Sequence, residues 1–169
     1  MNLLKALQIG DRKEIARSKD VANELLKQSS SLKSLFNILC DHSENAMIVS
    51  HGSYALKEAS LQSSEIRRRT MAFFQKEIDR FDQWEARENF LRICLIELER
   101  SQSLFEKVLP MTKDSSAIVQ SYASEYVIRY AHKYNPKSLE SLLKDIERFA
   151  GRASVRARIK KIKKELKIL

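Results

Sequence analysis

Two cysteines and three histidines are the side chains of this sequence best suited to bind a transition metal. Cys40 and His42 lie close enough in the chain to share an ion, whereas Cys94, His51 and His132 are scattered. A structural zinc site needs about four ligands at fixed spacing. No second pair lies within reach of the first, so we expect no metal and no cofactor. We interpret His42 as a residue at a loop end beside a core cysteine.

Catalytic motifs that depend on glycine are missing from the sequence. The chain has 3 glycines, too few for a phosphate-binding loop, and it has no nucleophile-elbow motif. We therefore expect no catalytic residue and no enzymatic activity.

Basic residues gather at the C-terminal end of the chain. Residues 144–169 contain ten basic and three acidic side chains, and so carry seven of the nine net positive charges. Six candidates for binding an anionic partner lie within about a third of a helical turn of one another: Arg152, Arg156, Lys160, Lys163, Lys164 and Lys167. Such a surface attracts nucleic-acid phosphates or an acidic protein. The alternative is a solvated cap, because a terminal repeat needs a polar outer face.

Aromatic residues form a second candidate surface. Tyr122, Tyr126, Tyr130 and Tyr134 recur every four residues, which places them along one side of a helix. The first three could form a platform that stacks bases or grips a peptide. The favoured alternative is that they pack between helices with their hydroxyl groups at the edge.

The elements that position these residues are predicted to be helices. Hydrophobic residues make up 43% of 169, enough for a core, while the 3 glycines and 2 prolines are too few for the tight turns of a β-sandwich or an α/β protein. Apolar residues recur at spacings of three and four almost throughout, and alternation of period two is absent. We expect about nine helical segments.

Some helix boundaries carry recognisable signals. Asp82 and Glu85 have the spacing of a capping box. Ser63 is expected to begin a helix, and Gly151 to end one in the left-handed conformation.

The apolar positions also repeat along the chain. Helices that start near Ile48 and Val119 have small or apolar residues at offsets 0, 4, 7, 8 and 11, and similar patterns start at Ala86 and Val155. These starts are 38, 33 and 36 residues apart. Amphipathic segments precede each of them, at residues 32–40, 65–81, 102–111 and 136–150, and residues 20–27 lead the series. Four stacked hairpins are favoured over a generic bundle of amphipathic helices.

The repeated pattern resembles that of HEAT repeats. Ala86-Arg87 and Val155-Arg156 stand where that family often has Val-Arg at the start of its second helix, and residues 154–158 resemble the last repeat of small stand-alone bacterial HEAT-like proteins. The similarity runs from about residue 32 to residue 166. It implies an all-α superhelix, or solenoid, of about four HEAT-like helical hairpins in a single domain over residues 1–169.

The sequence departs from the family pattern at two repeats. The family's arginine corresponds to Val49 in the first repeat and to Gln120 in the third. The family's ladder of Asp–Arg contacts therefore cannot be complete in this chain.

Three functions are consistent with this pattern. The first is a non-catalytic scaffold that binds a protein or peptide, and the second is a nucleic-acid-binding solenoid that uses the basic C-terminal helix. The most distant is an enzyme similar to HEAT-like alkylpurine DNA glycosylases, which use an Asp and tryptophans on their concave face. This chain has one tryptophan, Trp84, and its neighbour Asp82 is already expected to cap a helix.

Cellular location is predicted from what the sequence lacks. The N-terminus is too short and too polar for a signal peptide, no window approaches a membrane span, and the two cysteines suggest no disulfide framework. We expect a soluble cytoplasmic protein without a membrane partner. Its oligomeric state and partner identity stay open.

Overall fold

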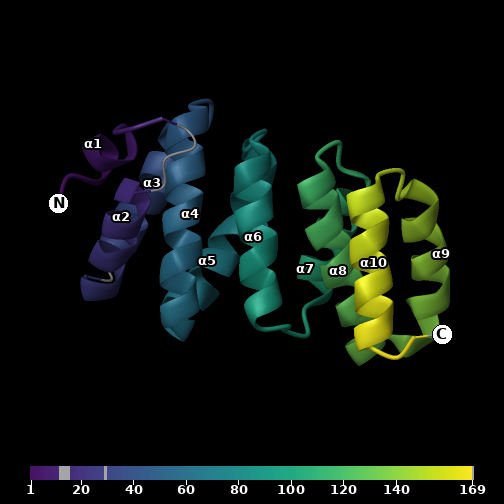
Figure 1. Cartoon of the computed structure of the whole chain (residues 1–169). Coiled ribbons are helices and arrows are strands. Elements are labelled where there is room, and N and C mark those ends of the chain that lie inside the picture. Colours follow the sequence, from purple (N-terminus) through teal and green to yellow (C-terminus); the bar gives the residue numbers. More distant parts are fainter. Residues whose placement is uncertain (12–15, 29, 169) are drawn as a thin grey trace. The chain divides into compact units, whose positions relative to one another are not determined.

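The computed structural model describes residues 1–11, 16–28 and 30–168, and all regular secondary structure within them is helical. The chain divides into two compact units, Met1–Ile93 and Cys94–Leu169, and each is considered by itself. Figure 1 labels the helices and colours them along the sequence. The predicted all-α fold class is confirmed, while the single domain over residues 1–169 stays a prediction.

The first unit is organised around one long central helix. Its elements in chain order are α1 (Leu3–Leu7), α2 (Ala16–Lys27), α3 (Ser30–Asp41), α4 (Ala46–Gln62), α5 (Ser64–Glu77), the 3-10 turn Ile78–Arg80 and most of α6 (Trp84–Ile96). Helices α2, α3 and α5 all pack against α4. Gly52 of α4 lies close to α3, because a Cβ atom there would lie 2.6 Å from the Leu39 Cδ2 atom and the leucine side chain would have to shift. The small residue at this repeat position therefore allows two helices of one hairpin to approach.

The second unit has the same organisation around α8 (Ala117–Tyr134). The other elements are α7 (Gln102–Val108), the 3-10 helix Leu109–Lys113, the 3-10 turn Pro136–Ser138, α9 (Leu139–Phe149) and α10 (Ala153–Glu165). Helices α7, α9 and α10 pack against α8. Because α10 packs on α8 as α2 packs on α4, alternate helices stack within each unit, as in a solenoid.

The four predicted hairpins correspond to α3–α4, α5–α6, α7–α8 and α9–α10, and the leading segment corresponds to α2. Rings of Phe74 and Phe90, 5.5 Å apart, join α5 to α6. A hydrogen bond of 3.0 Å from the buried Asn89 side chain to Ser53 joins α6 to α4. The helix α1 was not anticipated by the sequence pattern.

Helix α1 is held in place by a buried histidine. His51 of α4 is 1% exposed, and its Nδ1 and Nε2 atoms lie 2.9 Å from the carbonyl oxygens of Leu7 and Asp11. A ring N–H donates to a carbonyl oxygen, so the imidazole links the end of α1 to α4. His51 thus has a structural role in holding α1 against α4.

The expected helix boundaries have mixed outcomes. Ser63 does cap α5, because its hydroxyl accepts a 3.3 Å hydrogen bond from the Ile66 amide. Helix α6 begins at Trp84, so the preceding residue is Gln83 and the predicted cap at Asp82 is displaced by one position. The left-handed conformation predicted for Gly151 is wrong, because Gly10 is the glycine that has a positive φ among the described residues.

Helix α9 ends in a backbone turn that differs from the predicted glycine cap. Ala150 has φ −76° and ψ 60°, and the amide of Gly151 bonds to the carbonyl of Phe149 at 2.8 Å. This is an inverse γ-turn, which any residue can adopt. The freed carbonyl groups are bound by a side chain of α10, as described below.

Candidate functional site

The apolar stripe of α10 determines which way its cations face. Val155, Ile159 and Ile162 are at most 3% exposed, and the helix packs on α8. Leu166 continues the stripe and is half-buried, whereas Leu169 lies outside the described residues. With this stripe buried, Arg156, Lys160 and Lys163 lie on the flank toward α9, and Arg158, Lys161 and Glu165 lie on the flank toward α8.

Acidic residues neutralise the flank of α10 that faces α8. Glu125 of α8 accepts hydrogen bonds from Arg129 at 2.8 Å and from Arg158 at 2.6 Å. Glu165 bonds to Arg129 at 2.5 Å and lies 3.8 Å from Lys161. Burial lowers the pKa of the Arg129 guanidinium, but the hydrogen bonds to the two glutamates outweigh burial and the net shift is upward. This flank is an internal ion-pair network and offers little charge to a partner.

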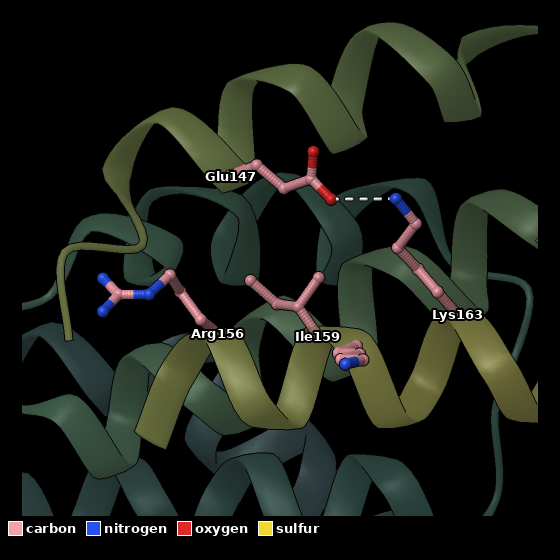
Figure 2. A pocket seen from close by; sticks show the side chains of 5 residues that line it. Glu147, Arg156, Ile159 and Lys163 are labelled. Carbon is pink, nitrogen blue, oxygen red and sulfur yellow. Dashed lines mark hydrogen bonds and ion pairs between the residues drawn. The ribbon is translucent and has the colours of Figure 1, made fainter. Parts of the chain in front are cut away.

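On the opposite flank, two of the six predicted cations already have partners within the unit. Arg156 Nη1 donates to the carbonyl oxygens of Ala150 at 3.1 Å and Gly151 at 2.5 Å. Lys163 is 29% exposed and its Nζ donates to Glu147 of α9 at 3.0 Å. Figure 2 shows Arg156 directed to the α9–α10 connection and Lys163 reaching across to Glu147. Both side chains are therefore engaged within the unit and are not simply solvated.

The other four predicted cations are exposed and have no partner in the described part of the chain. They are Arg152, Lys160, Lys164 and Lys167, and we call them the basic surface. Lys167 lies beyond the end of α10 and has φ 55°. Its backbone amide donates a hydrogen bond to the carbonyl oxygen of Lys164 at 3.3 Å. The amide of Ile168 donates to the carbonyl oxygen of Lys163 at 2.9 Å. This pattern is a Schellman motif with lysine at the position that usually holds glycine.

Arginines at the position of the HEAT resemblance play a structural role. Arg87 of α6 donates to the carbonyl of Phe81 at 3.3 Å, six residues earlier, as Arg156 donates to Ala150. At the equivalent position of α8, Gln120 donates to the carbonyl groups of Thr112 at 3.0 Å and Phe149 at 2.9 Å. Each of these side chains binds carbonyl groups at or just after the end of a helix, and so ties that helix end to α6, α8 or α10.

Tyrosines of α8 belong mainly to the core. Tyr126 and Tyr130 are 0% and 4% exposed, and their ring centroids are 5.9 Å apart. Burial raises the pKa of Tyr126. Tyr122 is half-buried, with the Arg158 guanidinium 3.8 Å from its ring centroid. The favoured packing role therefore agrees with the burial, and Tyr126 and Tyr130 present no exposed stacking platform.

Candidate residues for metal or acid–base chemistry remain apart. Within the described ranges, no group of three or more His, Cys, Asp or Glu side chains could hold a metal ion. Burial raises the pKa of the half-buried Cys40 thiol, and the negative charge of Glu77 raises it further. Asp82 is exposed, and Trp84, 38% exposed, begins α6. None of the helices in these ranges is long and apolar enough to cross a membrane.

Two glutamates that shape the site were not anticipated from the sequence. Glu125 and Glu147 lie 33 and 16 residues before their partners Arg158 and Lys163. Spacing within one helix cannot reveal such pairs, because they depend on how two helices face each other. The sequence signal for Glu147 was its position as one of three acidic residues in the basic segment 144–169, and Glu125 had no such signal.

The structure predicts different stability effects for two neighbouring cations. Arg156→Ala removes two hydrogen bonds from a charged donor and should lower the free energy of unfolding by about 1–2 kcal/mol. Lys160→Ala, one turn further along the same flank, should change it by less than about 0.5 kcal/mol. Chemical denaturation measures both. Equal changes in the free energy of unfolding would show that the hydrogen bonds from Arg156 to the α9–α10 connection do not stabilise the protein.

The Schellman motif predicts opposite signs for two glycine substitutions. Lys167→Gly removes the cost of a side chain in the left-handed region and should raise the free energy of unfolding by about 0.5–1 kcal/mol. Lys164→Gly, inside the helix, should lower it by up to about 1 kcal/mol. Thermal and urea unfolding of the two variants provides the measurement. A loss of stability in Lys167→Gly would contradict this helix end.

Comparison with protein-family models found no match, and neither did comparison with curated proteins or with solved structures. The resemblance to HEAT repeats therefore rests on the sequence pattern and stays a prediction.

Proposed function

We propose that this chain is a non-catalytic HEAT-like module that binds an acidic protein partner through the basic surface. The observation that carries the proposal is the contrast between the two flanks of α10. Glu125 and Glu165 pair with the cations on one flank, whereas Arg152, Lys160, Lys164 and Lys167 on the other are exposed and have no described partner. Unpaired cations on one face attract an anionic partner and raise its association rate.

Nucleic acid is the second candidate, supported by the same four cations. Contacts from them would reach phosphates and would not read bases. The burial of Tyr126 and Tyr130 removes the stacking surface that non-specific single-strand binders commonly combine with a basic groove. An acidic protein therefore fits the exposed chemistry better. The glycosylase-like enzyme is the most distant alternative and rests on Asp82 and Trp84 alone.

Charge reversal at the basic surface tests this proposal. The triple variant Lys160→Glu, Lys164→Glu and Lys167→Glu should weaken binding of poly-L-glutamate at low salt by more than about tenfold, because three attractive charges become repulsive. Arg156 and Lys163 stay unchanged, since their contacts stabilise the unit. Fluorescence anisotropy measures the affinity, and circular dichroism checks the fold.

A matched control separates this surface from net charge. Lys33→Glu, Lys133→Glu and Lys137→Glu change the charge equally at exposed lysines of α3, α8 and the turn before α9. This control should weaken binding by less than about threefold, because it makes the same change in net charge and leaves the basic surface intact. Equal losses of affinity in the two triple variants would refute binding at the basic surface. A labelled DNA duplex run in parallel would support the nucleic-acid candidate if it bound more tightly than poly-L-glutamate.

A further inference from the structure

A pocket of about 400 Å³ lies between α9 and α10, beside the basic surface. It is lined by Glu147, Arg156, Ile159, Lys160 and Lys163. Four of these five side chains are charged, yet the pocket lining is mostly apolar. Long basic side chains produce this combination by placing their methylene groups along a surface while their charged ends reach water. Figure 2 shows Ile159 pointing from α10 toward the space between the two helices.

The charges around the pocket are unequal. Arg156, Lys160 and Lys163 provide three cations against the single carboxylate of Glu147. Glu147 pairs with Lys163 at 3.0 Å, so this position already accommodates a carboxylate group. The exposed Lys160 stands at the same pocket without a described partner. A ligand that matches both features must combine an apolar group with negative charges on either side of it.

We propose that the pocket binds an acidic peptide segment of a partner protein, with one apolar side chain inserted above Ile159 and carboxylates on either side. This inference rests on the proposed function and names the partner's chemistry. The carboxylates contact Lys160 and compete with Glu147 for Lys163. A nucleic-acid backbone would satisfy the cations but would place polar phosphates against the apolar lining, which is unfavourable.

Peptide probes test the apolar anchor directly. The first is a short capped peptide of Glu and Asp with one central Leu, and the second has Ala in place of that Leu. Titration calorimetry with the full chain should show the Leu peptide binding about tenfold more tightly, because the larger side chain buries more apolar area. Equal affinity for the two peptides would show that the pocket does not bind an apolar side chain. It would overturn this inference and leave the proposed function unaffected. Failure of both peptides to bind would overturn the pocket and the proposed function together.

Removing the internal competitor tests the pocket from the protein side. Glu147→Gln should tighten binding of the Leu peptide by about threefold, because Lys163 no longer pairs within the chain. The matched control is Glu140→Gln, which makes the same charge change in the Glu140–Lys144 pair of 2.8 Å on α9. It should leave the affinity unchanged. Equal gains in affinity in both variants would show a general charge effect. They would overturn the proposed competition between Glu147 and the peptide for Lys163.

Two further measurements complete the test. Thermal melting of both glutamine variants checks that each is folded at the temperature of the titration. A DNA duplex serves as the competing class of partner. If the duplex displaces the Leu peptide and binds more tightly at the same salt concentration, the acidic-peptide assignment is overturned in favour of phosphate binding.

Discussion

Burial of an apolar stripe on each second helix is the constraint that the rest of the structure depends on. In α10 the stripe is Val155, Ile159 and Ile162, each at most 3% exposed. Burying each side chain is worth about 1.5–3 kcal/mol, more than a typical surface ion pair. The stripe therefore sets the rotation of the helix about its axis. That rotation determines which way each charged side chain of the helix faces. Similar stripes bury Val119, Ala123 and Tyr126 in α8.

That rotation separates the cations of α10 into two groups with different environments. Toward α8 they meet Glu125, and Glu165 of α10 itself adds to the network. Toward α9 they meet only Glu147 among the contacts described. The excess charge seen in the sequence is thereby concentrated on one flank, where four side chains are exposed. The pocket beside them has a mostly apolar lining, so this region offers a partner both positive charge and an apolar cavity.

Much of the fold was predictable because local periodicity reports burial. Offsets of 0, 4, 7 and 11 identified the second helices, and the scarcity of glycine and proline excluded sheet folds. Helix α1 escaped prediction because it is short and is held by His51, 44 residues away from Leu7 in the chain. The end of α9 was mispredicted because the chain leaves the helix through an inverse γ-turn, and Arg156 binds the carbonyl groups of Ala150 and Gly151 there.

The candidate site was predictable only in part, for a similar reason. Sequence spacing placed six cations on one side of α10, but it could not show that Arg156 and Lys163 are engaged within the unit. It left two roles open for the tyrosines, and the burial of Tyr126 and Tyr130 supports packing. Contacts between helices decide these points, and they depend on interhelical geometry that no single helix encodes.

The central claim is that a partner engages the chain at α9 and α10. Titrating the ¹⁵N-labelled full chain with the acidic Leu peptide, and following backbone amide resonances, tests it most directly. The predicted result is a set of shifts concentrated in α9, α10 and the connection between them, with Lys160 and Lys163 among the most affected. Shifts centred on the first unit, or spread evenly over both units, would contradict it.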